Sequence, residues 1–179
     1  RAIADMNSVI ERCVHTGQLA DQGLQPLAQA VDPVALSQGC ITTCRAPDQV
    51  DWAPPPTSGS LQADAQMLSI VLGNLLDNAC KYSAPGSRIQ FSLHSAERDG
   101  QAGWLWRLRN PAGPAGLPDA AQLFEKYYRS PQARRLSGSG LGLFLVKGLL
   151  RLMQGHIAYE AEGEHAVFSV WLPAQAVAR

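Results

Sequence analysis

The sequence predicts an α+β fold, a two-layer sandwich in which a mixed sheet is covered on one face by about three helices. Three observations support this prediction. Residues 67–83 place apolar side chains at helical spacing, several shorter segments alternate apolar and polar residues as half-buried strands do, and the two kinds of segment are intermixed along the chain. The 179 residues suit one domain with an appendage, or two small domains.

The composition restricts the possible functions. Fifteen basic and fifteen acidic residues cancel, so the chain has no general attraction to nucleic acid or to an anionic membrane. No apolar run approaches the roughly 18 to 20 residues of a membrane span. The four cysteines lack the paired spacing of zinc modules, and we expect reduced thiols in a cytoplasmic protein. Because the chain begins with Arg1 rather than Met, we expect it to be a piece of a longer protein.

Residues 1–24 form a region separate from the main domain. Apolar or small residues recur there at alternating three- and four-residue steps, which is a short heptad seam. This stripe fits packing against partner helices in a dimer, or a helix that lies on its own domain. We expect a helical segment over 1–24, a main domain over 31–173 and a tail over 174–179.

The main domain is predicted to begin with short elements. Asp32 followed by Pro33 is a helix-start pattern, which predicts a short helix within 31–44. An edge strand is expected over about 45–51, and a run of prolines then breaks regular structure. A short strand at 60–63 leads into the long helix.

Two hairpins follow the long helix. Residues 88–94 and 104–109 alternate apolar and polar side chains around the Asp99-Gly100 turn, so these strands should pair antiparallel. A second pair is predicted at 156–160 and 165–172.

The chain between the hairpins begins with glycine and proline. Residues 110–118 exclude regular structure, and they are either an ordinary loop or backbone that closely approaches a ligand. Residues 119–130 predict a short helix with Leu123, Phe124 and Tyr127 facing inward.

The long helix carries two opposed faces. Its polar face gathers Asn74, Asp77, Asn78 and Lys81, opposite an apolar arc that should be core. Amide oxygens can ligate a hard metal ion and an ammonium can lie against anionic oxygens, so this face suits a phosphate and its cation. Taken alone, the pattern is more typical of an ordinary surface helix.

A second candidate element lies far downstream. The polar stretch 131–139 has the composition of a mobile loop, and a largely apolar helix is predicted over 140–154, ending at Gly155. The glycine-rich sequence 138–143 opens this helix and offers unpaired backbone N–H groups and a positive dipole end to an anion. The two elements together predict two half-sites for one polyphosphate.

These motifs, in this order, resemble those of the catalytic, ATP-binding domain of bacterial sensor histidine kinases, within the GHKL ATPase superfamily. Residues 74–83 look like the N box, 123–130 like the F box and 138–143 like the second glycine box. The resemblance covers roughly 31–173 and implies a Bergerat-type ATP-binding fold that uses ATP and Mg²⁺. It also implies that residues 1–24 are the C-terminal part of a dimerisation and phosphoacceptor helix.

The resemblance assigns roles to individual residues. Asn78 would be the chief magnesium ligand, and Asn74 would lie beside it near the attacking end of the phosphates. Lys81 would touch phosphate, and Tyr82 would lie along the sugar or base. Other groups would contact the phosphates through side chains or backbone amides, namely Arg129, Arg134, Gly138, Gly140, Leu141 and Gly142.

The first glycine box departs from the family's pattern. The family has an aspartate there, whose carboxylate accepts a hydrogen bond from the amino group of adenine. The best match is 110–116, NPAGPAG, with Asn110 at the place of the aspartate and Gly116 among its glycines. An amide oxygen still accepts that bond but loses its charge-assisted part, roughly 1 kcal/mol. The prolines of this loop would block ATP if they filled the adenine pocket.

The resemblance implies an enzyme domain that transfers the γ-phosphoryl group of ATP to a histidine upstream of this chain. A response-regulator receiver domain would then accept the group. The implied full protein is a homodimer through its N-terminal helix, and it is cytoplasmic or the cytoplasmic part of a membrane-anchored protein. No contact with nucleic acid, and none of this fragment with a membrane, is expected.

The alternative is a degenerate pseudokinase domain that binds ATP poorly and acts by docking on other signalling proteins. The intact Asn74, Asn78, Lys81 and Gly140 favour the kinase, whereas the proline-rich loop at Asn110 favours the alternative. A GHKL ATPase of another kind is disfavoured, because such proteins have a glutamate where Asn74 stands.

Overall fold

The computed structural model describes residues 25–57, 59–131 and 138–175. The predicted helix over 1–24 therefore lies outside the described residues. The helices are α2 (Pro33–Thr43), α3 (Ala65–Tyr82) and α4 (Gly142–Leu152), with a short 3₁₀ helix, η1, at Pro47–Gln49. The strands are β1 (Gln29–Val31), β2 (Val50–Ala53), β3 (Leu61–Ala63), β4 (Ile89–Arg98), β5 (Gln101–Pro111), β6 (His156–Glu162) and β7 (His165–Pro173).

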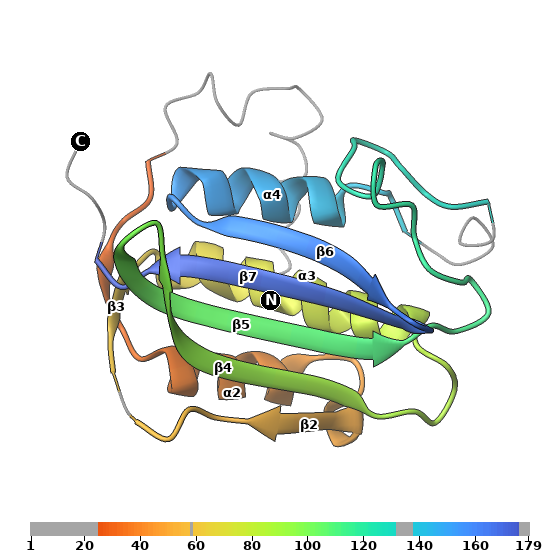
Figure 1. The fold of residues 1–179 in the computed structure, drawn as a ribbon, viewed down its shortest axis with the longest axis horizontal. Coiled ribbons are helices and arrows are strands. Elements are labelled where there is room, and N and C mark those ends of the chain that lie inside the picture. The colour runs from red at the N-terminus through yellow and green to blue at the C-terminus, as the bar shows by residue number, and fades with distance from the viewer. Residues whose placement is uncertain (1–24, 58, 132–137, 176–179) are drawn as a thin grey trace.

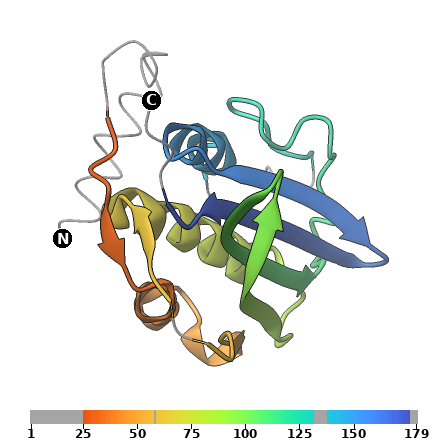
Figure 2. The same cartoon turned by 60° about the vertical axis from the view of Figure 1, so that its left-hand side comes forward.

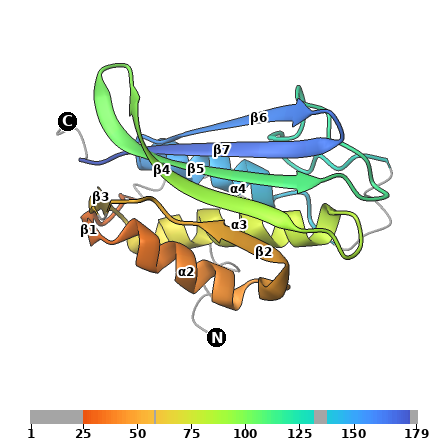
Figure 3. The same cartoon turned by 60° about the horizontal axis from the view of Figure 1, so that its bottom comes forward.

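A five-stranded sheet forms one layer of the molecule, in the order β2-β4-β5-β7-β6. Strand β2 is parallel to β4 and the other neighbours are antiparallel, so the sheet is mixed. Helices α2, α3 and α4 form the second layer on one face of this sheet (Figures 1 and 3). The predicted α+β sandwich is confirmed. None of the helices in the described ranges has the length and hydropathy that a membrane crossing requires.

Helix α3 begins and ends where its sequence signals predict. Its N-cap, Asp64, accepts hydrogen bonds from the backbone N–H groups of Gln66 and Met67, both at 3.0 Å. Its C-cap is Ser83, whose backbone N–H donates to Ala79 O at 3.0 Å. The predicted apolar face is core, consisting of Met67, Leu68, Ile70, Val71, Leu72, Leu75, Leu76 and Ala79.

Strand β5 supplies the central inward-facing row of the sheet. Trp104, Trp106 and Leu108 are at most 6% exposed, and period-two alternation puts Asn110 next in the same row. Trp106 Nε1 donates to Ser37 Oγ at 2.9 Å, which ties this row to α2. The sheet therefore delivers one polar residue, Asn110, to the end of its apolar face.

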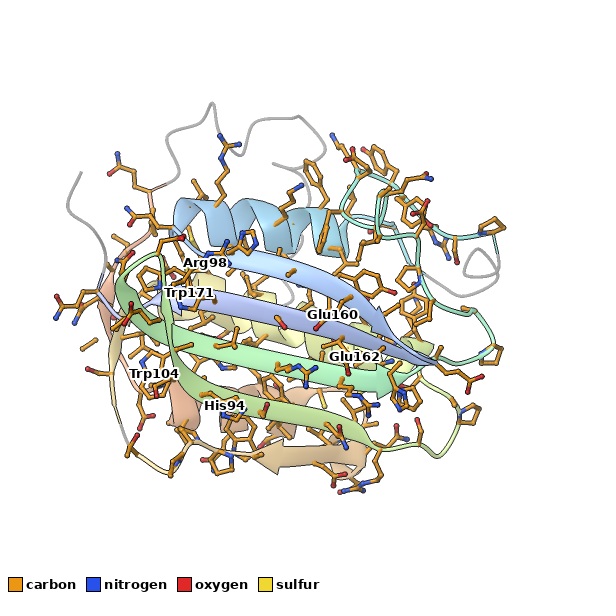
Figure 4. All side chains as sticks on the ribbon, viewed as in Figure 1. His94, Arg98, Trp104, Glu160, Glu162 and Trp171 are labelled. Carbon is orange, nitrogen blue, oxygen red and sulfur yellow. The ribbon has the colours of Figure 1, made fainter. Side chains whose placement is uncertain are left out.

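The opposite face of the sheet is polar. Glu160 and Glu162 of β6 lie on this face (Figure 4), where Arg107 forms an ion pair with Glu162 and Arg109 Nε lies 3.3 Å from the same carboxylate. His94 of β4 is exposed on the same face. Most side chains on this face are polar, as expected for a sheet covered by helices on one side, but Val167 and Trp171 of β7 project to it and are buried.

A second, two-stranded sheet was not predicted as a unit. Strands β1 and β3 pair antiparallel beside the main sheet (Figure 2). The backbone N–H of Gln62 also donates to Ala174 O at 2.8 Å, so the chain after β7 is bound to this pair. The predicted strand at 60–63 is confirmed, whereas β1 is too short to give a recognisable pattern.

Two predicted elements were wrong. No helix forms over 119–130: residues 120–127 make turns and a bend, and Tyr127 takes φ +64°, at which a right-handed helix would have to end. Leu123 is buried as predicted, but Tyr127 is 47% exposed. The strand expected over about 45–51 begins only at Val50, because the preceding residues, Pro47–Gln49, form η1.

Candidate functional site

A cavity of about 340 Å³ opens at the C-terminal end of α3. Its walls are α3, the loop after β5 and the chain leading into α4, which lie together at one end of the molecule (Figure 1). This volume falls within the roughly 300–1,000 Å³ of small-molecule pockets. The predicted site residues that line it are Asn74, Asn78, Lys81, Tyr82, Asn110, Gly116, Arg129, Gly138, Gly140 and Gly142.

One wall comes from side chains of α3, and we call Asn74, Asn78, Lys81 and Tyr82 the helix wall. Asn74 Nδ2 donates to Ile70 O at 2.8 Å, one turn earlier in the same helix. This bond orients the amide so that its oxygen is free to face the start of α4. The core face of α3 thus holds these polar groups in fixed positions.

The opposite wall is backbone, and we call Gly138, Gly140 and Gly142 the glycine wall. A Cβ atom added at Gly142 would lie 3.1 Å from Asn74 Oδ1, and one added at Gly138 would lie 2.7 Å from Lys81 Nζ. The two predicted half-sites, more than fifty residues apart, therefore lie against each other. Glycine at these positions keeps the two walls from touching, whereas any larger residue would have to displace the Lys81 or Asn74 side chain.

Gly140 is held differently from its neighbours. Its φ is +74°, and an added Cβ would lie 2.9 Å from the backbone carbon of Tyr127. The Tyr127 N–H donates to Gly140 O at 3.0 Å, so two left-handed residues are joined by one backbone bond. This pairing takes Tyr127 out of the helical conformation, so the predicted helix over 119–130 cannot run through it.

The proline-rich loop after β5 forms a wall of the cavity and does not fill it. Gly113 N–H donates to Tyr82 O at 2.8 Å, and Ala84 N–H donates to Pro111 O at 3.3 Å. A Cβ at Gly113 would lie 2.5 Å from Ser83 O, so the loop closely follows the end of α3. Asn110 and Gly116 face the cavity from this loop.

Two predicted site residues are not among those found to line the cavity. Leu141 is 2% exposed within the core, and its backbone N–H donates to Ser139 Oγ at 3.3 Å. Arg134 lies outside the described residues.

Two charged residues that were not among the predicted site residues also line the cavity. Arg45 and Asp77 line the cavity, and the backbone N–H of Arg45 donates to Asp77 Oδ1 at 3.2 Å. Asp77 belongs to the polar face of α3, and this helical spacing was enough to place it near Asn74 and Asn78 from the sequence. Arg45 comes from the turn after α2, and its position depends on packing that no local pattern shows.

The back of the helix wall is packed against α2. Burial is the main cause that raises the pKa of the Cys80 thiol to about 11, and nearby Cys44 raises it further. Burial likewise raises the pKa of Cys40 to about 11. These thiols are neutral at physiological pH, and the described part of the chain contains no disulfide among Cys40, Cys44 and Cys80.

The family is identified by a profile described as histidine kinase-, DNA gyrase B-, and HSP90-like ATPase, which matches residues 63–176. The chain belongs to this ATPase family. The matched range contains both walls of the cavity. The resemblance to the ATP-binding catalytic domain of sensor histidine kinases is confirmed.

Curated relatives of this ATP-binding domain are histidine kinases. The signal transduction histidine-protein kinase/phosphatase MprB of Mycolicibacterium smegmatis is 41% identical over 85 residues, which cover 47% of this chain and 16% of that protein. The circadian input-output histidine kinase CikA of Synechococcus elongatus is 34% identical over 119 residues, which cover 64% of this chain and 15% of that protein. The chain thus spans about a sixth of the length of these relatives.

Solved structures share the fold of the domain. Mycobacterial sensor histidine kinase MprB matches with a TM-score of 0.67 at 24% identity, covering 83% of this chain and 100% of that one. Full-length ShkA in complex with AMPPNP matches with a TM-score of 0.71 at 23% identity, covering 98% of this chain and 37% of that one. These likenesses show a common architecture for the sheet and its helices.

Proposed function

We propose that the cavity binds ATP with Mg²⁺ and that the domain transfers the γ-phosphoryl group to a histidine of the full protein outside this chain. The observation that carries this proposal is the contact between the helix wall and the glycine wall. Positions where a Cβ would lie 2.7 Å from Lys81 Nζ and 3.1 Å from Asn74 Oδ1 are occupied by glycines. The space left free is bounded by amide oxygens, an ammonium group and backbone, which are the groups that suit a polyphosphate.

Each residue of the helix wall has a role in this proposal. Asn78 supplies a neutral oxygen ligand for Mg²⁺, which requires hard oxygen donors. Asn74 lies beside Asn78. Lys81, nearer the end of α3, neutralises phosphate oxygens with its ammonium group. Tyr82 lies along the sugar or base. Bound Mg²⁺ supplies charge neutralisation of the phosphates.

The glycine wall and the loops complete the proposed site. Backbone N–H groups of the glycine wall approach the phosphates, and Arg129 and Arg45 add positive charge at the cavity. Leu141 contributes only through the backbone and the core, because its side chain is buried. Arg134 keeps its proposed role at the γ-phosphate, as inferred from the sequence.

The transfer step needs little covalent chemistry from this chain. A neutral imidazole nitrogen donates its lone pair to the γ-phosphorus, the bond between that phosphorus and the β,γ-bridging oxygen breaks, and its electron pair leaves with ADP. The domain's part is to position the phosphates and stabilise their charge.

The rest of the proposal concerns the full protein. By analogy with the histidine kinase family, the full protein has an upstream helical domain that dimerises and carries the phosphoacceptor histidine. A response-regulator receiver domain is the next acceptor of the phosphoryl group. The part described by this chain lies in the cytoplasm. The pseudokinase alternative gains no support, because the loop at Asn110 borders the cavity and leaves it open.

Calorimetric titration with a nonhydrolysable ATP analogue tests the binding step. We expect saturable binding in the presence of Mg²⁺ and clearly weaker binding in EDTA. In the full protein, radiolabel from the γ-position of ATP should appear as acid-labile, base-stable phosphohistidine. Absence of binding under both conditions would reject the nucleotide site, whereas binding without labelling would reject only the transfer.

A further inference from the structure

Asn110 is a polar residue in an apolar row. It continues the inward-facing row of Trp104, Trp106 and Leu108 on β5 and is only 4% exposed. Its cross-strand neighbour on β7 is Ala166. A buried amide in such surroundings requires hydrogen-bond partners.

The amide of Asn110 is only partly satisfied by the protein. Its Nδ2 donates to Pro111 O at 3.3 Å, a long bond to the adjacent residue. No hydrogen bond to its Oδ1 is found within the described ranges, and this oxygen is not one of the fully buried side-chain atoms that lack a partner, so it keeps some exposed surface. Because Asn110 lines the cavity, its unused acceptor is accessible to a ligand from that side.

The cavity near Asn110 suits a flat ring. Small and aromatic side chains line it there: Ala166 faces Asn110 across the strands, Phe168 follows two residues along β7, and Ala79 and Ala115 line the same cavity. The charged residues of the site and the glycine wall belong to the other sides of the cavity, and Gly116 is the one glycine of the loop after β5 among the lining residues. An apolar wall with one buried amide recognises a heteroaromatic base through its polar edge.

An asparagine can read that edge in two ways. Its oxygen accepts a hydrogen bond from the 6-amino group of adenine, and after a half-turn of the amide its nitrogen donates to the 6-oxo group of guanine. The half-turn breaks the 3.3 Å bond to Pro111 O and turns Oδ1 toward that carbonyl oxygen, which disfavours the flipped amide. One neutral hydrogen bond of this kind changes affinity by at most about tenfold. A carboxylate at this position would only accept, and would repel the 6-oxo group of a purine held in the same pose.

We infer that this site accepts 6-oxopurine nucleoside triphosphates as well as ATP, with Asn110 as the residue that determines base specificity. The inference rests on the proposed function, since it presupposes that a nucleotide occupies the cavity. It makes GTP and ITP ligands of the same site, bound with at most about a tenfold loss of affinity relative to ATP.

The test measures the affinity of the unmodified chain for nonhydrolysable analogues of ATP, GTP and ITP, each in the presence of Mg²⁺. Binding of GTP or ITP within about tenfold of ATP supports the inference, and a larger loss for both overturns it. If ATP itself does not bind, the proposed function fails together with the inference. If ATP alone binds, only the inference fails.

The variant Asn110→Asp provides the mechanism test. It should tighten ATP several-fold and weaken GTP by at least about a hundredfold, because a carboxylate cannot donate to the 6-oxo group. Gln62→Glu adds the same charge at an exposed position on β3 and should leave the GTP/ATP ratio unchanged. An equal change for both nucleotides in Asn110→Asp would overturn the role of Asn110. If this variant does not fold by thermal melting, the comparison of ligands on the unmodified chain decides alone.

Discussion

The helix wall and the glycine wall face each other across one cavity but are built in different ways. The helix wall consists of side chains on α3, whose other face is core with residues such as Leu72 and Leu76 at 0% exposure. The glycine wall precedes and begins α4, and two of its members, Gly138 and Gly140, have positive φ. One wall is positioned by packing and the other by individual backbone conformations.

The difference shows which changes each wall should tolerate. On the helix wall a side chain can be shortened without disturbing the fold, because the core face of α3 remains intact. On the glycine wall the addition of a single methyl group enters the cavity or strains the backbone. The helix wall should therefore separate binding from stability, whereas the glycine wall should couple them at Gly140 and separate them at Gly142.

The largest effect is expected for Asn78→Ala on the helix wall. Loss of a direct magnesium ligand should weaken Mg²⁺-dependent binding of an ATP analogue by about a hundredfold or more, since even residues that only support metal ligands contribute tenfold to a hundredfold. The melting temperature should hardly change, because Asn78 is only partly buried. Calorimetry with and without Mg²⁺ measures the first effect, and thermal melting the second.

A matched control for this variant is Gln66→Ala, an exposed position at the start of the same helix. It should leave nucleotide affinity unchanged. Equal affinities of Asn78→Ala and the unmodified chain would remove Asn78 from the proposed site.

The packing behind the helix wall can be tested through its thiols. With the pKa of Cys80 and Cys40 at about 11, little thiolate forms at pH 8, and alkylation by iodoacetamide should be about a hundredfold slower than for a cysteine in a short peptide. Because the thiolate is the reactive form and burial favours the neutral thiol, the alkylation rate should keep rising with pH until about 11. Timed quenching and mass spectrometry of the peptides measure it. Rapid alkylation at pH 8 would show that α3 is not held against α2.

Gly140→Ala should damage both stability and binding. The new Cβ would lie 2.9 Å from the Tyr127 backbone at a φ of +74°, and such strain costs about 1 to 3 kcal/mol. Gly86 provides a control with φ +73° and no atom within 4 Å, away from the cavity. Chemical denaturation should show a smaller loss for Gly86→Ala, and only Gly140→Ala should weaken nucleotide binding. Equal losses for the two variants would mean that the Tyr127 contact adds nothing.

The elements that sequence patterns predicted correctly are those determined by local periodicity. Helix α3 and the two hairpins follow from apolar spacing and turn residues, and each is found within a few residues of its predicted bounds. The helix over 119–130 was wrong for a non-local reason. The Leu123 and Tyr127 spacing is helical, but Tyr127 bonds instead to Gly140, thirteen residues later. No pattern within the segment contains that information.

The candidate site divides in the same way. Asn74, Asn78 and Lys81 could be grouped from the helical period, and the glycines from the backbone freedom that a bound anion requires. Arg45 could not be assigned, because the turn that carries it reaches the cavity only through the bond to Asp77. The sequence also could not show whether the loop after Asn110 fills the cavity or borders it, because this depends on the hydrogen bonds between that loop and the end of α3.

Gly142→Ala should separate binding from stability on the glycine wall. Gly142 begins α4, and alanine is a better helix former, so stability should stay within about 0.5 kcal/mol or improve. The added Cβ would lie 3.1 Å from Asn74 Oδ1, which narrows the space between the walls, and nucleotide affinity should fall several-fold. Parallel denaturation and calorimetry on this variant measure both quantities. Lower stability with unchanged affinity would contradict the contact between the two walls.

The smallest effects isolate backbone conformation from contact. Neither Gly73, within α3, nor Gly116, in the loop after β5, has an atom within 4 Å of an added Cβ, but only Gly116 has a positive φ, +68°. Gly73→Ala should stabilise the domain by about 0.5 to 1 kcal/mol through helix propensity. Gly116→Ala should destabilise it by about 1 kcal/mol through strain alone. Urea denaturation measures the change in the free energy of unfolding for each variant. Changes of opposite sign would show that α3 and the loop after β5 differ in backbone conformation alone, without any contact of the new methyl group. Changes of the same sign would contradict this difference.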